Sequence, residues 1–384
     1  MRIIVAPDSF KESMDAGEAA NAIVKGVARV DADIECIVLP VADGGEGLVS
    51  VLEDALDASI EIMNVTGPMG QMVRARFGWA EQTKTGIIEV AEACGVHLVS
   101  EKYRDVWRAS TEGVGEMLVH LRERGAKTII VGLGGSVTND GGAGMARALG
   151  ASILDASGSE VSPGPLGLHE ASCFSFQTAD DWKDLEILVA CDVTNPLLGL
   201  DGASYVFGMQ KGAIKTDLKL LDCLLNKWAS LVDETIGAPD MGVIAGGGAA
   251  GGLGAALYSL LGAHLRPGIE IVLDSLKFAD IIGGADLVLT GEGRVDRQTC
   301  GGKAPWGVCQ KALAFGVPTI AFGGIIGDAA KGLTGPEGFF DIVGITPADS
   351  SIEDALMNGP KNLSNAVERR VRALVGIDSW RVRC

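Results

Sequence analysis

The apolar positions of the first sixty residues alternate between strand-like runs and a helical stripe. RIIVA at residues 2–6 is a short apolar run, and Asp15 with Glu18 three positions later has the form of a helix capping box. Apolar side chains then recur every three or four positions over 19–27, as on one buried helix face. A second apolar run, ECIVLPV at 35–41, leads into ADGGEG. Strand, helix and strand in this order predict a βαβ unit whose strands end in polar loops.

The pattern changes between about residues 60 and 90. EIMNVTGPMG, MVRARFGWAE and TGIIEVAEA carry β-branched residues with turn signals between them, which is typical of hairpin strands. A helical pattern over 114–121 precedes the apolar run TIIVGLGG. The later runs EILVACDV, DLVLTGEG, PTIAFGG and DIVGITP each end in a polar or glycine-rich stretch, and helical patterns separate the last of them. The C-terminal third is therefore again βαβ.

This order of elements predicts an α/β fold with two α/β domains. We expect a Rossmann-like parallel-sheet domain, formed by residues 1–60 together with 285–384, and an inserted mixed-sheet α/β domain at residues 61–284. The length of 384 residues suits two hydrophobic cores better than one. The active site is expected in the cleft between the two domains.

Charge and cysteine usage limit the possible partners. The formal net charge of −18 repels nucleic acid and anionic membranes, so a small anionic ligand would need a locally basic pocket. The eight cysteines include no C-x-x-C pair and the four histidines do not cluster, which argues against a zinc site and favours a reducing, cytoplasmic location. The apolar run before Asp8 is too short for a signal peptide. The uncharged stretch 241–263 is so rich in glycine and alanine that we expect a glycine-rich loop entering a buried helix, not a membrane span.

Common nucleotide and hydrolase motifs are missing from the sequence. There is no G-x-x-x-x-G-K-[ST], no H-E-x-x-H, no G-x-S-x-G and no protein-kinase signature. Residues 246–251 do match G-x-G-x-x-G, although the chain has 54 glycines and chance matches are easy. An NAD-dependent oxidoreductase of a small hydroxy acid therefore stays an alternative.

Six polar stretches follow apolar runs and share one kind of chemistry. Each alone could be a turn or a helix cap, but a structural turn does not need lysine, arginine and carboxylates together. This mixture suits phosphoryl transfer, in which cations neutralise the moving phosphoryl group and a carboxylate accepts the proton of the attacking hydroxyl. The residues concerned are Asp8, Ser9, Lys11, Asp43, Glu46, Ser136, Thr138, Asn139, Asp140, Asp192, Asn195, Gln210, Lys211, Glu292, Arg294, Asp296, Gln298 and Lys303.

The stretch GLGGSVTNDGG at 132–142 has three possible interpretations: a phosphate-binding loop, a tight turn that packs well, or part of a metal site. Glycines let backbone N–H groups approach phosphate oxygens, and the helical pattern that follows supplies a favourable N-terminus. The composition therefore favours a phosphate-binding loop.

Taken together, the motifs resemble those of the bacterial type-1 glycerate kinases. PDSFKES, ADGGEG, GGSVTNDGGAGM, CDVTNPL, FGMQKGA, AGGLGAAL, RPGIEIVL and TGEGRVDRQT…GKAP occur in that order over most of the chain. The resemblance implies ATP-dependent phosphorylation of D-glycerate, usually at the 2-hydroxyl, with Mg²⁺ as cofactor and a two-domain α/β fold. D-glycerate and ATP would be the small-molecule partners, with no nucleic acid and no membrane. The oligomeric state stays open.

Within this resemblance, residue type suggests a role for each candidate. Lys11 and Arg294 would neutralise the glycerate carboxylate and Ser9 would help orient it. Asp192 is the first candidate for the general base and Asp296 the second. Mg²⁺ would be reached by Asp43 or Glu46. The ATP phosphates are expected at Gly134, Gly135, Ser136, Thr138, Asn139, Asp140, Gly141 and Gly142.

Two alternatives remain besides the oxidoreductase. Phosphorylation at the 3-hydroxyl would use the same residues, because the choice depends on small differences in substrate placement. A non-catalytic glycerate or nucleotide sensor would bind without turnover.

Overall fold

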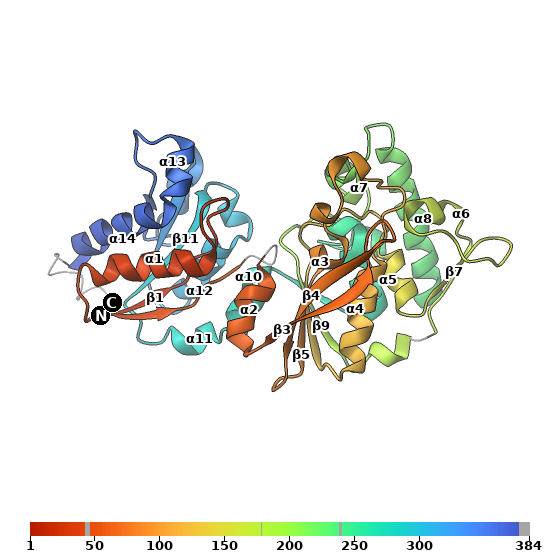
Figure 1. Ribbon diagram of the computed structural model, residues 1–384, viewed down its shortest axis with the longest axis horizontal. Coiled ribbons are helices and arrows are strands. Elements are labelled where there is room, and N and C mark those ends of the chain that lie inside the picture. Colours follow the sequence, from red (N-terminus) through yellow and green to blue (C-terminus); the bar gives the residue numbers. More distant parts are fainter. Residues whose placement is uncertain (43–46, 178, 238–239, 376–384) are drawn as a thin grey trace. The chain divides into compact units, whose positions relative to one another are not determined.

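The structure is a computed structural model that describes residues 1–384 except 43–46, 178, 238–239 and 376–384. The chain forms two compact units (Figure 1). The first contains residues 1–43 and 269–384, and the second contains residues 44–268. The boundaries between the units therefore fall after residues 43 and 268, whereas the sequence predicted them near residues 60 and 284. Helix α2 (Leu48–Leu56) belongs to the second unit because it packs on strands β4 (Met72–Ala80) and β5 (Thr85–Glu89).

The first unit contains one five-stranded sheet in the order β13-β12-β11-β1-β2, in which all neighbouring strands are parallel. The strands are β1 (Arg2–Val5), β2 (Glu35–Val38), β11 (Leu287–Val295), β12 (Thr319–Ile326) and β13 (Asp341–Gly344). The helices are α1 (Ala16–Ala28), α10 (Gly268–Ser275), which begins one residue before the boundary, α11 (Phe278–Ile281), α12 (Ala304–Leu313), α13 (Ile352–Met357) and α14 (Gly359–Val375). The predicted Rossmann-like parallel sheet is confirmed.

Helices cover both faces of this sheet because successive strand residues point to opposite sides. On β12, Ile320 and Phe322 join the apolar core formed with α1 and α14, whereas Ala321 between them joins the core formed with α12. The predicted capping box of α1 is present: Glu18 N–H donates to Asp15 Oδ1 (2.7 Å) and Asp15 N–H donates to Glu18 Oε2 (3.2 Å).

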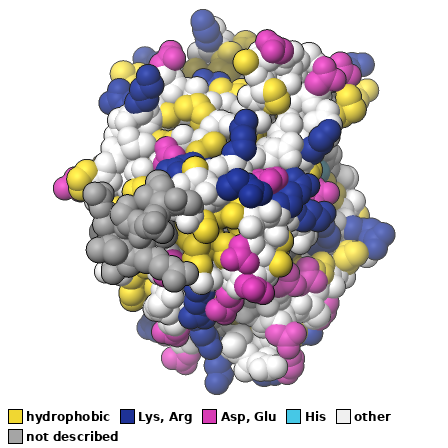
Figure 2. Space-filling model, turned by 90° about the vertical axis from the view of Figure 1, so that its left-hand side faces the viewer, with side chains coloured by type: hydrophobic (Ala, Val, Ile, Leu, Met, Phe, Trp, Pro, Cys, Tyr) yellow, Lys and Arg dark blue, Asp and Glu magenta, His cyan; other side chains and the backbone are white. Residues whose placement is uncertain are grey.

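Charged side chains of both signs are mixed on the surface of the first unit (Figure 2). The arginine-rich end of the sequence contributes to this surface through α14. Arg370 pairs with Asp341 (2.5 Å), and Arg372 pairs with Glu368 one helical turn away (2.9 Å). Arg372 is exposed, whereas Arg370 is half-buried beside Asp341.

The second unit contains a six-stranded mixed sheet in the order β10-β9-β6-β5-β4-β3. The hairpin strands β3 (Ser59–Thr66), β4 and β5 are antiparallel, and β5 continues in parallel into β6 (Thr128–Gly132), β9 (Glu186–Ala190) and β10 (His264–Arg266). A small second sheet pairs β7 (Ser152–Leu154) with β8 (Cys173–Ser175). The predicted mixed sheet is confirmed.

The remaining helices of the second unit pack around its apolar core. They are α3 (Val90–Cys94), α4 (Glu112–Glu123), α5 (Ala143–Ala148), α6 (Gly164–Glu170), α7 (Ala203–Phe207), α8 (Leu218–Ile236) and α9 (Leu253–Leu261). The uncharged stretch near residue 250 forms a glycine-rich loop that enters the buried helix α9, as expected. In the part of the chain that the structure describes, no helix has the length and apolarity needed to cross a membrane.

The G-x-G-x-x-G match at 246–251 lacks the structural context of a dinucleotide fingerprint. A 3-10 turn at Met241–Val243, not a strand, precedes it. Its glycines allow close backbone packing instead: a Cβ on Gly251 would lie 2.0 Å from the carbonyl oxygen of Thr138. The match therefore gives no support to the oxidoreductase alternative.

Candidate active site

The polar loop after β1 lies against β11 in the first unit. Strand β11 pairs with β1 only as far as Leu289 but continues beside β12 to Val295. The loop crosses this projecting part of β11, and Asp8 N–H donates to Gly291 O (2.9 Å). A Cβ on Gly291 would lie 2.9 Å from the ring of Phe10. Glycine at this position thus lets the PDSFKES and TGEGRVD segments adjoin at the carboxyl edge of the sheet.

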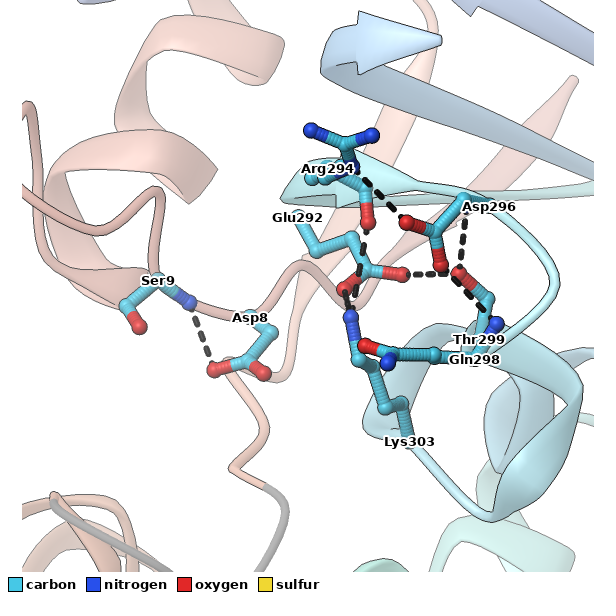
Figure 3. Close-up of polar contacts among 8 residues, drawn as sticks. All are labelled: Asp8, Ser9, Glu292, Arg294, Asp296, Gln298, Thr299 and Lys303. Carbon is cyan, nitrogen blue, oxygen red and sulfur yellow. Dashed lines mark hydrogen bonds and ion pairs between the residues drawn. The ribbon is translucent and has the colours of Figure 1, made fainter. Parts of the chain in front are cut away.

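Glu292 is a buried carboxylate on β11, with 5% of its surface exposed. Its Oε1 accepts a hydrogen bond from Thr299 Oγ1 (2.7 Å), and its Oε2 accepts one from Lys303 Nζ (2.8 Å) (Figure 3). Burial raises the pKa of Glu292, and the bonds from Lys303 and Thr299 oppose that rise. Glu292 therefore fixes Lys303 where the chain enters α12.

Arg294 lies two residues further along the same strand and is 59% exposed at its side chain. Its Nε donates to Asp296 Oδ2 (2.8 Å), and Gln298 N–H donates to Asp296 Oδ1 (2.8 Å). The backbone N–H of Gln298 and the Arg294 guanidinium hold the pKa of Asp296 below its usual range. Asp296 is thus a stable carboxylate that orients Arg294. Figure 3 shows the two terminal nitrogens of Arg294 directed away from it.

Ser9 and Lys11 lie on the loop that crosses β11. Ser9 is half-buried, and its N–H donates to Asp8 Oδ1 (2.6 Å). Lys11 is exposed, and its backbone nitrogen would lie 3.3 Å from a Cβ on Gly293, the residue before Arg294. The first unit therefore brings two exposed cations onto adjoining backbone segments.

The first candidate for the general base belongs to the second unit. Asp192 follows β9 in the second unit, is half-buried, and accepts a hydrogen bond from Gly268 N–H (2.9 Å) at the start of α10. Asp43 and Glu46 lie outside the described residues. Elsewhere in the described ranges, no group of three or more His, Cys, Asp or Glu side chains is placed to hold a metal ion.

The glycine-rich stretch after β6 divides into an exposed turn and a buried segment. Gly134 is partly exposed and Gly135 is exposed, with a left-handed φ of +70°. Val96 N–H donates to Gly135 O (2.8 Å). The side chain of Ser136 is already buried, so the turn accessible to a ligand is short.

The buried segment, Thr138 to Gly142, is fixed by contacts within the protein. Asp140 is fully buried and accepts hydrogen bonds from Thr111 N–H and Oγ1 (both 2.9 Å) and from the N–H groups of Gly142 and Gly144 (both 3.1 Å). Burial raises the pKa of Asp140, and these four bonds oppose the rise. Asn139 Nδ2 donates to Ser204 Oγ (3.0 Å).

The glycines of this segment are needed for packing. Gly141 has a left-handed φ of +62°, and a Cβ there would lie 2.5 Å from the ring of Trp228. A Cβ on Gly142 would lie 2.3 Å from the Cβ of Ala256. Contacts within the protein therefore account for the glycines at 141 and 142, and the exposed backbone of the stretch is at residues 134–135.

Lys211, to which residue type assigned no role, is buried beside this loop with 2% of its surface exposed. Its Nζ donates to Ser136 Oγ (3.0 Å) and to Thr138 O (2.7 Å). Burial lowers the pKa of Lys211 to about 8. The only sequence signal was a lysine between an apolar helix and a glycine, which does not distinguish a buried ammonium from an exposed one.

A parallel sheet covered by helices on both faces is a doubly wound α/β arrangement, and ligands of such folds generally bind at the carboxyl ends of the strands, where the cations and carboxylates of this chain lie. A sequence model of the glycerate kinase family matches residues 3–375. The glycerate kinase of Halalkalibacterium halodurans is 40% identical over 381 residues, or 98% of each chain. The glycerate 2-kinase of Escherichia coli is 40% identical over 378 residues, also 98% of each chain.

A solved structure from Salmonella typhimurium LT2, provisionally assigned as glycerate kinase 2, is similar with a TM-score of 0.87, 41% identity and 98% coverage of both chains. The chain belongs to the glycerate kinase family and is an enzyme of the kinase class. The resemblance read from its motifs is confirmed.

Proposed function

We propose that this enzyme transfers the γ-phosphoryl group of ATP to the 2-hydroxyl of D-glycerate with Mg²⁺ as cofactor. The 2-position is supported by the similarity to the Escherichia coli glycerate 2-kinase over 98% of both chains. The observation that carries the proposal is the exposed guanidinium of Arg294, oriented by Asp296 beside the segment that holds Lys11.

Arg294 and Lys11 would bind the carboxylate of glycerate. The Nε of Arg294 is occupied by Asp296, and its two terminal nitrogens form a fork that matches the geometry of a carboxylate. The formal charge of the chain is −18, so a local pair of cations is needed to hold an anion. Ser9, on the same loop as Lys11, would help orient the substrate.

Asp192 is our first candidate for the general base and Asp296 our second. The lowered pKa of Asp296 and its contact with Arg294 suit orientation better than proton abstraction. A general base contributes about 10²- to 10⁴-fold to the rate, so Asp192→Asn should lower kcat by at least about 100-fold. Near-full turnover of Asp192→Asn would contradict its assignment.

The Gly134–Gly135 turn is proposed to contact the ATP phosphates. The backbone there is at least partly exposed, whereas the other candidates for this contact, Ser136 to Gly142, are buried in the second unit. Mg²⁺ would offset charge on the phosphates, and it is usually held by one or two carboxylates together with water and substrate oxygens. Asp43 and Glu46 stay our candidates for that contact.

An enolase-coupled assay tests the function directly. The protein, ATP, Mg²⁺ and D-glycerate are mixed with enolase and no mutase, and the absorbance of phosphoenolpyruvate is followed. An ATP-dependent signal supports 2-phosphorylation, because enolase acts on 2-phosphoglycerate. Release of ADP without the signal would mean 3-phosphorylation, and no ADP release would contradict kinase activity on D-glycerate. Because enolase itself needs Mg²⁺, the metal requirement of the kinase is tested by measuring ADP release directly, without enolase, and omitting Mg²⁺ should abolish that release.

A further inference from the structure

The burial of Lys211 needs an explanation, because removing an ammonium from water is costly without compensating interactions. Its two bonds go to a hydroxyl and a carbonyl, and no carboxylate of the described residues lies within ion-pair distance of Nζ. The charged or titratable groups that act on it are Asp140, which favours the ammonium electrostatically, and the buried thiol of Cys94. A methionine of similar length would fill the same space without this cost, so packing alone does not account for a lysine.

Both bonds of Lys211 hold the chain immediately after the exposed Gly134–Gly135 turn. Ser136 is the first residue beyond the turn and Thr138 is the third. Val96 N–H holds the turn from a second side through Gly135 O, and Ser136 forms an isolated β-bridge with Gly95. Three segments of the second unit, at residues 95–96, 134–138 and 211, are thus joined at this point.

Arg104 joins the segment around Val96 to the segment that carries Lys211. Its guanidinium donates to Val96 O (3.3 Å), Val99 O (3.3 Å) and Gln210 O (3.2 Å). Arg104 therefore links Gln210, the residue before Lys211, to Val96, the residue that bonds the turn. Gly212, with a φ of +101°, lets the chain pass closely: a Cβ there would lie 2.8 Å from Arg104 O.

We propose that Lys211 is a positioning residue that holds the Gly134–Gly135 turn in the conformation that binds the phosphates of ATP. This inference rests on the proposed function of that turn. The ammonium fixes the side chain of Ser136 and the carbonyl of Thr138 together, so the turn before them cannot rotate independently. It also places a positive charge one hydrogen bond from the residue that follows the turn, which favours an anionic ligand there.

The test is a comparison of ATP and D-glycerate kinetics in Lys211→Met, Lys211→Arg and Ser136→Ala. A hydrogen bond that involves a charged group contributes about 1.5–3 kcal/mol, which corresponds to roughly 10- to 100-fold in affinity. We expect Lys211→Met to raise the KM for ATP by about tenfold or more while the KM for D-glycerate changes little. Lys211→Arg, which keeps a cation and its donors, should recover part of the ATP affinity.

Lys227→Met is the matched control. Lys227 is a half-buried lysine of the same unit, and its Nζ donates to a backbone carbonyl, His169 O, at the same 2.7 Å as the bond from Lys211 to Thr138 O. If the loss of any lysine–carbonyl bond raised the KM for ATP, both Lys211→Met and Lys227→Met would show the effect. If Lys211 positions the turn, only Lys211→Met should raise the KM for ATP. Ser136→Ala should raise the KM for ATP by less and in the same direction.

The outcomes separate the positioning role from the proposed function. Absence of ATP-dependent turnover in the unmodified enzyme would overturn the proposed function itself. Turnover in the unmodified enzyme, with an unchanged KM for ATP in a folded Lys211→Met, would overturn only the positioning role. If Lys211→Met does not fold, Ser136→Ala decides: an unchanged KM for ATP in this milder variant would overturn the role.

Discussion

Replacement of Asp140 gives the clearest test of what the GGSVTNDGG signature does. The carboxylate accepts four hydrogen bonds from donors in the α4 and α5 segments, and its side chain is fully buried. Thr111 Oγ1 also accepts a bond from Met145 N–H (2.9 Å), so the same group links both helices. If this arrangement is structural, Asp140→Ala should lower the free energy of unfolding of the second unit, and any change in ATP affinity should be secondary.

The size of the effect follows from the donors left behind. A buried donor without a partner costs about 1–3 kcal/mol, and neighbouring donors do not add fully. With three backbone N–H groups and one hydroxyl unpaired, we expect Asp140→Ala to lose about 4 kcal/mol. In Asp140→Asn, the remaining amide oxygen can take the place of Oδ2, which accepts three of the four bonds. Because burial raises the pKa of Asp140, the neutral amide also recovers part of the desolvation cost, and we expect a loss of about 2 kcal/mol.

Urea unfolding followed by tryptophan fluorescence measures this loss. Trp228 Nε1 donates to Gly141 O (2.8 Å), so its emission reports on the loop itself. Asp155→Ala is the control: this carboxylate of the same unit also accepts bonds from nearby N–H and hydroxyl groups, but water can replace it there. Equal unfolding midpoints for Asp140→Ala and Asp155→Ala would refute the structural reasoning. A normal midpoint with a raised KM for ATP would show that Asp140 faces the ligand.

Four further predictions concern the charged groups. Burial lowers the pKa of Lys211 to about 8, so the KM for ATP should rise as pH increases through about 8 in the unmodified enzyme and stay flat in Lys211→Met. Between about pH 8 and 10.5, Lys211 is protonated in the unfolded chain and largely neutral in the folded one. As pH increases over that range, the free energy of unfolding of the unmodified enzyme should therefore rise relative to that of the Lys211→Met variant. A fall would contradict the lowered pKa. Asp296→Asn should raise the KM for D-glycerate about tenfold by releasing Arg294, whereas a large loss of kcat at constant KM would identify Asp296 as the base. Lys303→Met should lower the melting temperature more than Glu292→Gln, because the first leaves a buried carboxylate without its counter-ion and the second leaves an ammonium that water can solvate; equal shifts would contradict this.

The elements that depend on short-range patterns could be predicted from the sequence. The capping box of α1 involves residues three positions apart, and alternating strands and helices are visible as apolar periods. The parallel sheet followed from the same alternation. The end of β11 did not, because glycine and glutamate usually mark loops. TGEGRV continues the strand, since β12 pairs with it as far as Val295.

The role of the glycine-rich stretch could not be predicted, because composition does not distinguish a phosphate-binding loop from a packed turn. The groups that require glycine at 141 and 142 are Trp228 and Ala256, which lie far away in the sequence. The burial and bonding of Lys211 could not be predicted either, because its partners Ser136 and Thr138 precede it by more than seventy residues. Only the fold brings these segments together.

The position of the charged residues on β11 bears on how the site functions. Glu292 and Arg294 are two residues apart on a strand, so they project to the same side of the sheet. Glu292 is buried and fixes Lys303, while Arg294 is exposed and fixed by Asp296, so each has its own counter-ion. Strands hold side chains in place more firmly than loops do, which reduces the entropy lost when a substrate binds. In a chain with a net charge of −18, a guanidinium that is both rigid and exposed is the kind of group that can attract a small anion and fix its orientation.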